Sequence, residues 1–273
     1  MVASKKDDRL GKTFKTNRYG NVVVVEYRNA LNVVVEFTET GFRTGTSFSK
    51  IKSGEIRDPL AKTFYGVGYI GVGSHKYSDR ENGISKIPTV SSRWVNMLQR
   101  CYDKEYQDRY LKGYYKGCEV CEEWHNFQNF AEWFYSQQNC FEKGYEIDKD
   151  LTIIGNTVYS PATCSLIPSE INGFITYQPS GRLLPYGVIV QNSKGNPYVA
   201  RIKYKGKLQI IGYFKTAEDA YNAACSAKND FIKELAFEYR EVLDKEIYKN
   251  LMSFSMDNFI NARKQKELLN KEK

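Results

Sequence analysis

The stretch GVIVQNSKGNPYVARIKYKGKLQIIGYFKTAEDAYNAACSAKNDFIKELA, residues 187–236, predicts three short strands followed by one amphipathic helix. Side chains of the second strand alternate between an apolar and a mostly cationic face. The apolar set is Tyr198, Ala200, Ile202 and Tyr204. The opposite set is Val199, Arg201, Lys203 and Lys205. We therefore expect a small sheet with two unlike faces.

The predicted helix after Thr216 carries small residues at helical spacing, which allow it to lie close against the apolar face of the sheet. These residues, with one aromatic, are Ala220, Ala223, Ala224, Ala227 and Phe231. If the helix covers the apolar face, the cationic face is left free for a partner.

The region 171–217 contains no Asp or Glu, which favours a phosphate-rich partner. Its cations are Arg182, Lys194, Arg201, Lys203, Lys205, Lys207 and Lys215. A narrow sheet of this kind can enter the major groove of DNA, where such side chains meet phosphates and base edges. We take as DNA-binding candidates Arg201, Lys203, Lys205, Lys207, Gln209 and Tyr213. The alternative is a solvated basic face.

This module resembles the plant ethylene-response-factor, or apetala-two, DNA-binding domain. The resemblance rests on the alternating A-R-I strand, the G-Y-F turn and the E-D-A-Y-N-A-A helix start. It implies that the sheet face binds duplex DNA in the major groove. Tyr198 stands near the position of a Trp in that family, so the target sequence does not carry over.

The central segment IDKDLTIIGNTVYSPATCSLIPSEIN, residues 147–172, predicts a ββα unit. It reads as a strand, a turn at Gly155-Asn156, a second strand and a helix that opens near Pro168-Ser169. Such a unit can hold one divalent metal between an acidic strand residue and an Asn or His on the helix.

With its surroundings, this segment resembles the HNH family of homing-type endonucleases, in particular the small phage members. The matching runs are RWVNMLQRCY at 93–102, GCEVCEEWHNFQNFAEWF at 117–134 and the segment 146–172. The resemblance implies DNA hydrolysis with Mg²⁺ or Mn²⁺ held by Asp148 and Asn172. Several members of that family also carry an apetala-two module after the nuclease unit.

Lys149 occupies the position of the histidine base of active family members, and Thr163 that of a loop-steadying Asn. A lysine of ordinary pKa near 10.4 is a poor base at neutral pH. Three interpretations of Asp148-Lys149-Asp150 stay open: a nuclease centre with an unusual base, an inactive unit that grips DNA, or a charged strand edge. The catalytic candidates are Asp148, Lys149, Asp150 and Asn172.

Cys118, Cys121 and His125 form only half of a zinc signature, so we expect free thiols and no structural zinc. The 273-residue chain has a net charge of +8 and lacks an apolar run long enough to span a membrane. Its first residues have no apolar signal core, so we expect a cytoplasmic protein, in the bacterial host if phage-encoded.

Together these patterns predict a modular α+β protein with four parts. They are an N-terminal β unit (1–62), an HNH-like domain with helices (63–178), an apetala-two-type domain (179–236) and a basic helical tail (237–273). In the first part, VVVVEY and NVVVEF predict consecutive strands of a hairpin. In the second part, apolar residues at helical spacing predict helices at 91–102 and 119–136. The predicted function is double-stranded DNA binding with hydrolysis or nicking by a divalent metal. The alternatives are a catalytically inactive, sequence-selective binder that acts as regulator or decoy, and a module that blocks another protein.

Overall fold

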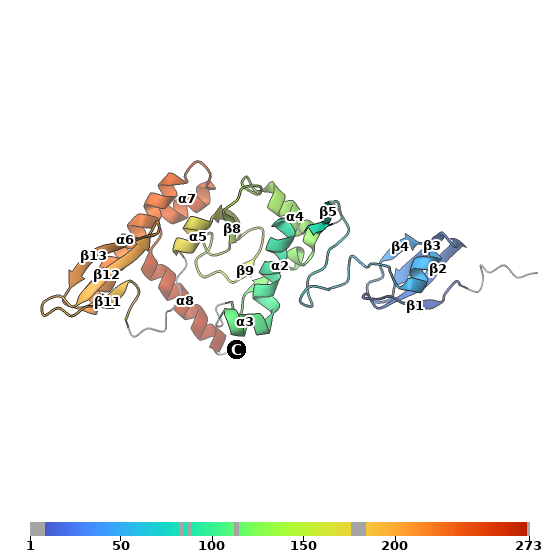
Figure 1. Ribbon diagram of the computed structural model, residues 1–273, viewed down its shortest axis with the longest axis horizontal. Helices are drawn as coiled ribbons and strands as arrows, with labels where there is room; N and C mark the ends of the chain where they lie inside the picture. The colour runs from blue at the N-terminus through green and yellow to red at the C-terminus, as the bar shows by residue number, and fades with distance from the viewer. Residues whose placement is uncertain (1–8, 82–83, 87–88, 112–114, 176–183, 272–273) are drawn as a thin grey trace, which may run out of the picture. The chain divides into compact units, whose positions relative to one another are not determined.

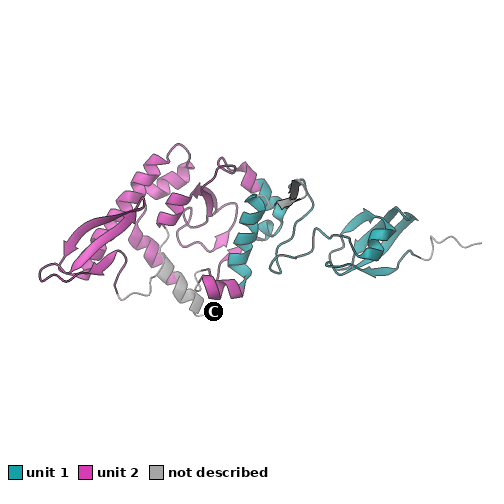
Figure 2. Ribbon diagram, in the orientation of Figure 1, with its two compact units in different colours: residues 1–103, 122–132 teal, residues 104–121, 133–273 magenta. Residues whose placement is uncertain are grey.

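The computed structural model describes residues 9–81, 84–86, 89–111, 115–175 and 184–271. The protein is a mixed α+β chain with several small sheets (Figure 1), which confirms the expected fold class. It divides into two compact units, residues 1–103 with 122–132 and residues 104–121 with 133–273 (Figure 2). The four-part modular organisation stays a prediction. None of the described helices is both long and apolar enough to cross a membrane.

Unit 1 begins with an antiparallel four-stranded sheet in the order β1-β2-β3-β4. The strands are β1 (Thr13–Lys15), β2 (Asn21–Asn29), β3 (Asn32–Phe37) and β4 (Arg43–Thr46). The predicted hairpin of two valine-rich strands is confirmed, and their alternate valines are buried with Phe37 and Ile51. Helix α1 (Phe48–Ser53) was not expected; Ser47 caps its start and Gly54, at φ 69°, ends it.

The second part of unit 1 contains the short hairpin β5 (Asp79–Glu81) and β6 (Ile84–Lys86), then helix α2 (Thr89–Tyr102). The predicted helix at 91–102 is confirmed. Its fully buried Trp94 donates a hydrogen bond from Nε1 to the carbonyl oxygen of Trp124, at 2.7 Å.

The expected continuous helix over 119–136 is wrong in its first half. Strand β7 (Glu119–Val120) and a 3-10 turn, η1 (Glu122–His125), precede helix α4 (Phe127–Ser136). Tertiary pairing overrides local helix preference, because β7 pairs in parallel with β9 (Val158–Tyr159).

In unit 2, the central segment differs from the simple ββα expectation. Strand β8 (Tyr145–Asp148) pairs antiparallel with β10 (Ser165–Pro168), while β9 between them joins β7 instead. Helix α5 (Ser169–Ile175) follows β10 directly, so the predicted helix start is confirmed. Helix α3 (Lys104–Tyr110) also belongs to this unit.

The predicted three strands and helix of 187–236 are confirmed. Strands β11 (Val188–Val190), β12 (Tyr198–Tyr204) and β13 (Lys207–Phe214) form an antiparallel sheet, followed by α6 (Ala217–Glu238). The hydroxyl of Thr216 caps α6 by accepting the Asp219 N–H at 3.0 Å. Ala200, Ala220 and Ala224 are fully buried where the helix meets the sheet.

Helices α7 (Lys245–Met252) and α8 (Met256–Lys271) contribute to a second core with α5 and α6. The tail is therefore helical, as predicted. Leu235, Leu251 and Phe259 are among the buried residues of this core.

Lys228 of α6 is a buried charge, only 1% exposed. Its ammonium lies over the rings of Tyr186, at 4.6 Å, and Phe174, at 5.4 Å. Burial lowers the pKa of Lys228 to about 8, and Cys225 opposes the shift. The aromatic rings offset part of the cost of burying the charge.

Stability should therefore depend on Lys228 in alkaline solution. Because the pKa of Lys228 is lower in the folded state, burial of the charged lysine destabilises the fold fully below pH 8. This destabilisation is relieved as pH rises toward the unfolded pKa of 10.5. We expect the free energy of unfolding of the wild type to rise by about 2 kcal/mol relative to Lys228→Met between pH 7 and 10. Urea unfolding of both proteins measures this difference, and a constant difference across that range would contradict the prediction.

Candidate functional site

The register of the sheet β11–β13 determines which side chains share a face, because directly paired residues of antiparallel strands project to the same side. Arg201 pairs with Ile210, and Lys203 pairs with Leu208. Helix α6 packs against the opposite face, where Ala200 and Ile202 are buried. We call the face opposite α6 the outer face; it carries Val199, Arg201, Lys203, Leu208, Ile210 and Tyr213.

The outer face combines cations with exposed apolar groups. Lys203 is exposed and Arg201 is half-buried. Leu208, Ile210 and Tyr213 are 55%, 57% and 51% exposed. Three of the six DNA-binding candidates, Arg201, Lys203 and Tyr213, therefore lie together on one accessible face.

The other three candidates do not share the outer face. Lys205 lies in the two-residue turn after β12, with positive φ at Lys205 (48°) and Gly206 (77°), so its expected place in the strand is wrong. Its ammonium contacts Glu238 and lies 3.8 Å from Glu234, both on α6.

Lys207 and Gln209 pair with Tyr204 and Ile202, which places them on the α6 side of the sheet. A β-bulge between Ala200 and Arg201 interrupts the pairing beyond this point. Of the remaining cations of this region, Lys194 and Lys215 are exposed, and Arg182 lies outside the described residues.

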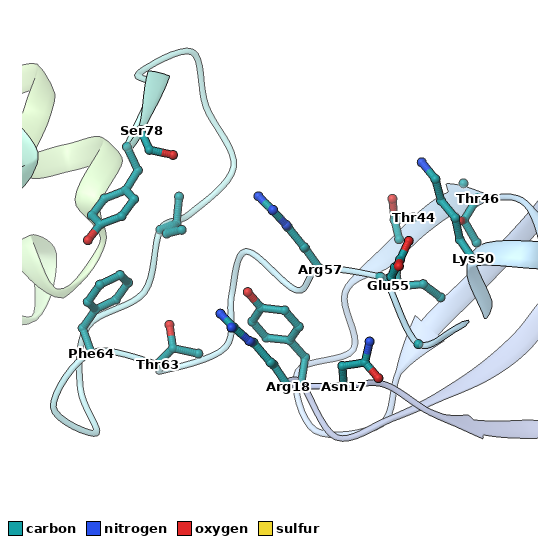
Figure 3. A pocket seen from close by; sticks show the side chains of 16 residues that line it. Asn17, Arg18, Thr44, Thr46, Lys50, Glu55, Arg57, Thr63, Phe64 and Ser78 are labelled. Carbon is teal, nitrogen blue, oxygen red and sulfur yellow. The ribbon is translucent and has the colours of Figure 1, made fainter. Parts of the chain in front are cut away.

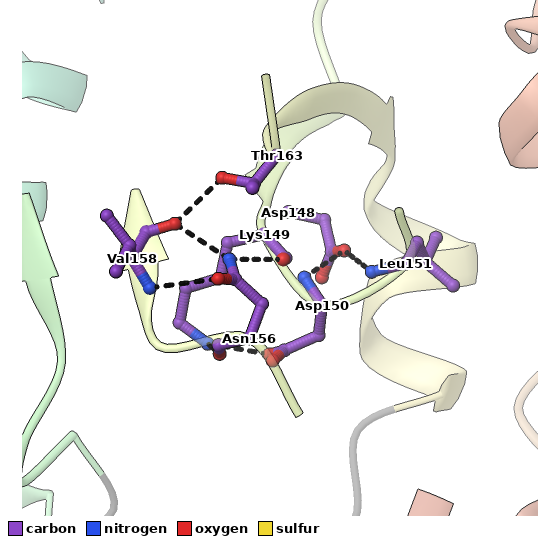
Figure 4. Close-up of polar contacts among 7 residues, drawn as sticks. All are labelled: Asp148, Lys149, Asp150, Leu151, Asn156, Val158 and Thr163. Carbon is purple, nitrogen blue, oxygen red and sulfur yellow. Dashed lines mark hydrogen bonds and ion pairs between the residues drawn. The ribbon is translucent and has the colours of Figure 1, made fainter. Parts of the chain in front are cut away.

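Asp148 ends strand β8 and is only 8% exposed. Its Oδ1 accepts hydrogen bonds from the backbone N–H groups of Asp150, at 2.9 Å, and Leu151, at 2.7 Å (Figure 4). Burial raises the pKa of Asp148 to about 6; the charge of Asp150 adds to the rise, while the two backbone bonds and Lys149 oppose it. Asp148 thus caps the loop after β8, and burial makes its ionised carboxylate less favourable than in water.

Lys149 is 5% exposed and is held inside the same loop. Its Nζ donates to Asp150 Oδ2 at 2.8 Å and to the carbonyl oxygen of Asn156 at 3.1 Å. Burial alone would lower the pKa of Lys149, but Asp150 raises it to a net value above the ordinary one. Asp150 therefore favours the protonated form of Lys149, which cross-links the loop.

Asn156, which the sequence indicated only as a turn residue, organises the other side of the loop. Its Nδ2 donates to the carbonyl oxygens of Lys149, at 2.9 Å, and Val158, at 2.7 Å. Thr163 also donates to the Val158 carbonyl, at 2.8 Å. Thr163 thus contributes to steadying this loop through a hydroxyl.

Asn172 of α5 donates from Nδ2 to Glu146 Oε2 at 2.6 Å. Glu146 and Asp148 are two residues apart on β8, so they project to the same face. The sequence missed Glu146, although the alternation in Glu146-Ile147-Asp148 carried the signal. The structure therefore places Glu146 in contact with Asn172, on the strand face that Asp148 shares.

These oxygen-bearing side chains are of the type that Mg²⁺ and Mn²⁺ prefer. Among the described residues, no group of three or more His, Cys, Asp and Glu side chains is arranged to hold a metal. A metal at β8 would therefore need the amide of Asn172 as well as carboxylates.

Unit 1 contains a separate open hollow of about 1020 Å³ beside the N-terminal sheet. Figure 3 shows Arg18 and Arg57 extending into this space, with Glu55 and Lys50 also on its lining. Its mixed charges do not define one ligand chemistry.

Comparison with family models, with curated proteins and with solved structures gives no match to this chain.

Replacing Asp148 separates its role as a loop cap from its role as a charge. Asp148→Asn keeps an oxygen that accepts both backbone N–H groups, whereas Asp148→Ala leaves them without this acceptor. We expect Asp148→Ala to lower the free energy of unfolding by about 1–3 kcal/mol, and Asp148→Asn at pH 7.5 to equal or exceed the wild type.

The pH dependence gives an independent check. Because the folded pKa is raised from 3.8 to about 6, ionisation of Asp148 favours unfolding, and stability is lost as pH rises from 4 to 6. Denaturant titrations across that range should show the loss in the wild type and a smaller loss in Asp148→Asn. Equal pH profiles would rule out this account of Asp148.

Proposed function

We propose that the chain binds double-stranded DNA through the outer face of the sheet β11–β13. The observation that carries this proposal is the strand register, which puts Arg201 and Lys203 side by side on the face that α6 does not cover. The surrounding region 171–217 contains no carboxylate side chain to compete with phosphate. A basic surface free of acids attracts a polyanion over several ångströms.

The ion pairs of the basic residues favour the outer face, and not the turn after β12, as the DNA-binding surface. Lys205 is already neutralised by α6 carboxylates. Within the described residues, Arg201 and Lys203 form no ion pair, so both charges remain for a partner.

The size of the sheet also supports a duplex. Neighbouring strands lie about 4.8 Å apart, so three strands span roughly 10 Å, and the major groove of B-DNA is about 12 Å wide. The sheet of strands β11, β12 and β13 can therefore approach the base edges without opening the duplex.

The double variant Arg201→Gln/Lys203→Gln tests this function. We expect its affinity for duplex DNA at 0.1 M salt to fall at least about tenfold, and the slope of log K against log salt to decrease by about 2, because two phosphate contacts are lost. Fluorescence anisotropy over a salt series measures both quantities.

The matched control is Lys233→Gln/Lys249→Gln, which removes the same charge from α6 and α7. It should keep most of the affinity if the outer face is the binding surface. Equal losses in both variants would indicate attraction by net charge alone. Absence of binding to any duplex at low salt would instead favour the protein-blocking alternative.

A second candidate function is phosphodiester hydrolysis of the HNH type at β8 and α5. The observation in its favour is the contact of Asn172 with Glu146, on the same strand face as the buried Asp148. These residues would hold Mg²⁺ or Mn²⁺, which activates water and stabilises charge on phosphate when bound. Lys149 would hold the loop in place and would not take a proton.

Nicking of supercoiled plasmid separates the two candidates. If the β8 site hydrolyses DNA, nicking should require Mg²⁺ or Mn²⁺ and fall at least about 100-fold in Asp148→Asn, which keeps the loop cap but removes the carboxylate. The control Lys233→Gln should cut like the wild type. Bound but uncut DNA would leave the inactive binder, a regulator or decoy, as the function.

A further inference from the structure

The outer face has an unusual side-chain composition for a surface that contacts DNA. Leu208 is paired with Lys203, and Ile210 is paired with Arg201, so each cation has an exposed aliphatic neighbour. Leu208 and Ile210 are 55% and 57% exposed, although β13 also has an inner face on which α6 packs. These two side chains contribute little to the core and are available to a partner.

Strand β13 offers little hydrogen-bonding capacity on this face. Its amide side chain, Gln209, pairs with Ile202 and therefore lies on the α6 side. The outer-face residues of β13 are Leu208, Ile210 and Tyr213. Among these three side chains only the hydroxyl of Tyr213 can form hydrogen bonds, so base recognition by Leu208 and Ile210 must depend on apolar contact.

We propose that Leu208 and Ile210 recognise the C5-methyl groups of pyrimidines in the major groove, and so select duplexes rich in thymine or 5-methylcytosine. This inference rests on the proposed DNA-binding function and specifies what the outer face reads. Arg201 and Lys203 supply the attraction to phosphate or guanine, and the two aliphatic side chains supply the discrimination.

The chemistry of the major groove singles out this ligand. The thymine methyl is the apolar group that its base edges present, while the other edge groups are hydrogen-bond donors or acceptors. An aliphatic side chain placed against cytosine N4 or guanine O6 displaces water without replacing its hydrogen bonds. Against a methyl group, the same side chain removes apolar surface from water.

The charges of the outer face argue against a second copy of this sheet as the occupant. Two such faces would bring Arg201 and Lys203 of one chain against the same cations of the other. The region 171–217 has no Asp or Glu to compensate them. A polyanion that also presents small apolar groups satisfies both kinds of side chain.

The test compares thymine with uracil, which differ only in the C5-methyl group. Duplexes that the full-length protein retains from a random-sequence pool are sequenced and then synthesised with thymine or with uracil. We expect the thymine duplex to bind about fourfold more tightly for each methyl contacted, or at least about tenfold for two. In a duplex that has cytosine at the contacted positions, replacing this cytosine by 5-methylcytosine should raise the affinity.

The variant Leu208→Ala/Ile210→Ala should bind both duplexes with nearly equal affinity, while keeping the salt dependence due to Arg201 and Lys203. The matched control is Ile153→Ala/Ile154→Ala, which removes two exposed aliphatic side chains from a loop of the same unit. This control should discriminate between thymine and uracil as the wild type does.

Three outcomes overturn the inference. Equal affinity of the wild type for thymine and uracil duplexes would reject methyl recognition and leave DNA binding intact. If the Leu208→Ala/Ile210→Ala variant still discriminates between thymine and uracil duplexes, the discrimination would be assigned to DNA shape. Failure to bind any duplex at low salt would reject the proposed function itself, and with it this inference.

Discussion

The close contact between α6 and the sheet β11–β13 determines which side chains of this region can meet a partner. Ala220 and Ala224 are fully buried against the sheet, in one cluster with Ala200 of β12. The approach is close enough that a Cβ on Gly187 would lie 2.6 Å from the Cβ of Ala224. Since one face is sealed in this way, every exposed side chain of the opposite face is directed to solvent.

That contact also divides the cations of the sheet into two groups. Those at the turn lie near α6, where Glu234 and Glu238 neutralise Lys205. Those in the middle of β12, Arg201 and Lys203, lie away from these carboxylates. Basic residues that look equivalent in the sequence are therefore not equally available to a partner, because some already form ion pairs within the fold.

The loop after β8 uses charge in a different way. Asp148, Lys149 and Asp150 satisfy one another and the local backbone, so removing one of them leaves a buried group without its partner. This loop follows the strand that carries Glu146, and Glu146 accepts a hydrogen bond from Asn172 of α5. The residues that look most catalytic in sequence are thus partly committed to holding the site together.

The amino-acid sequence by itself determined the small sheet, the alanine-lined helix, the valine-rich hairpin and the helices around Trp94 and in the tail. Each of these depends on local periodicity, which a single segment carries. Only the tertiary structure decided that β8 pairs with β10, that β7 replaces the start of a predicted helix, and that Asn172 meets Glu146. It also decided that Lys205 and Gln209 lie away from the outer face, because a two-residue turn and strand register set side-chain direction. Periodicity describes one segment at a time, whereas pairing and ion contacts depend on residues distant in the chain, so no local pattern could specify them.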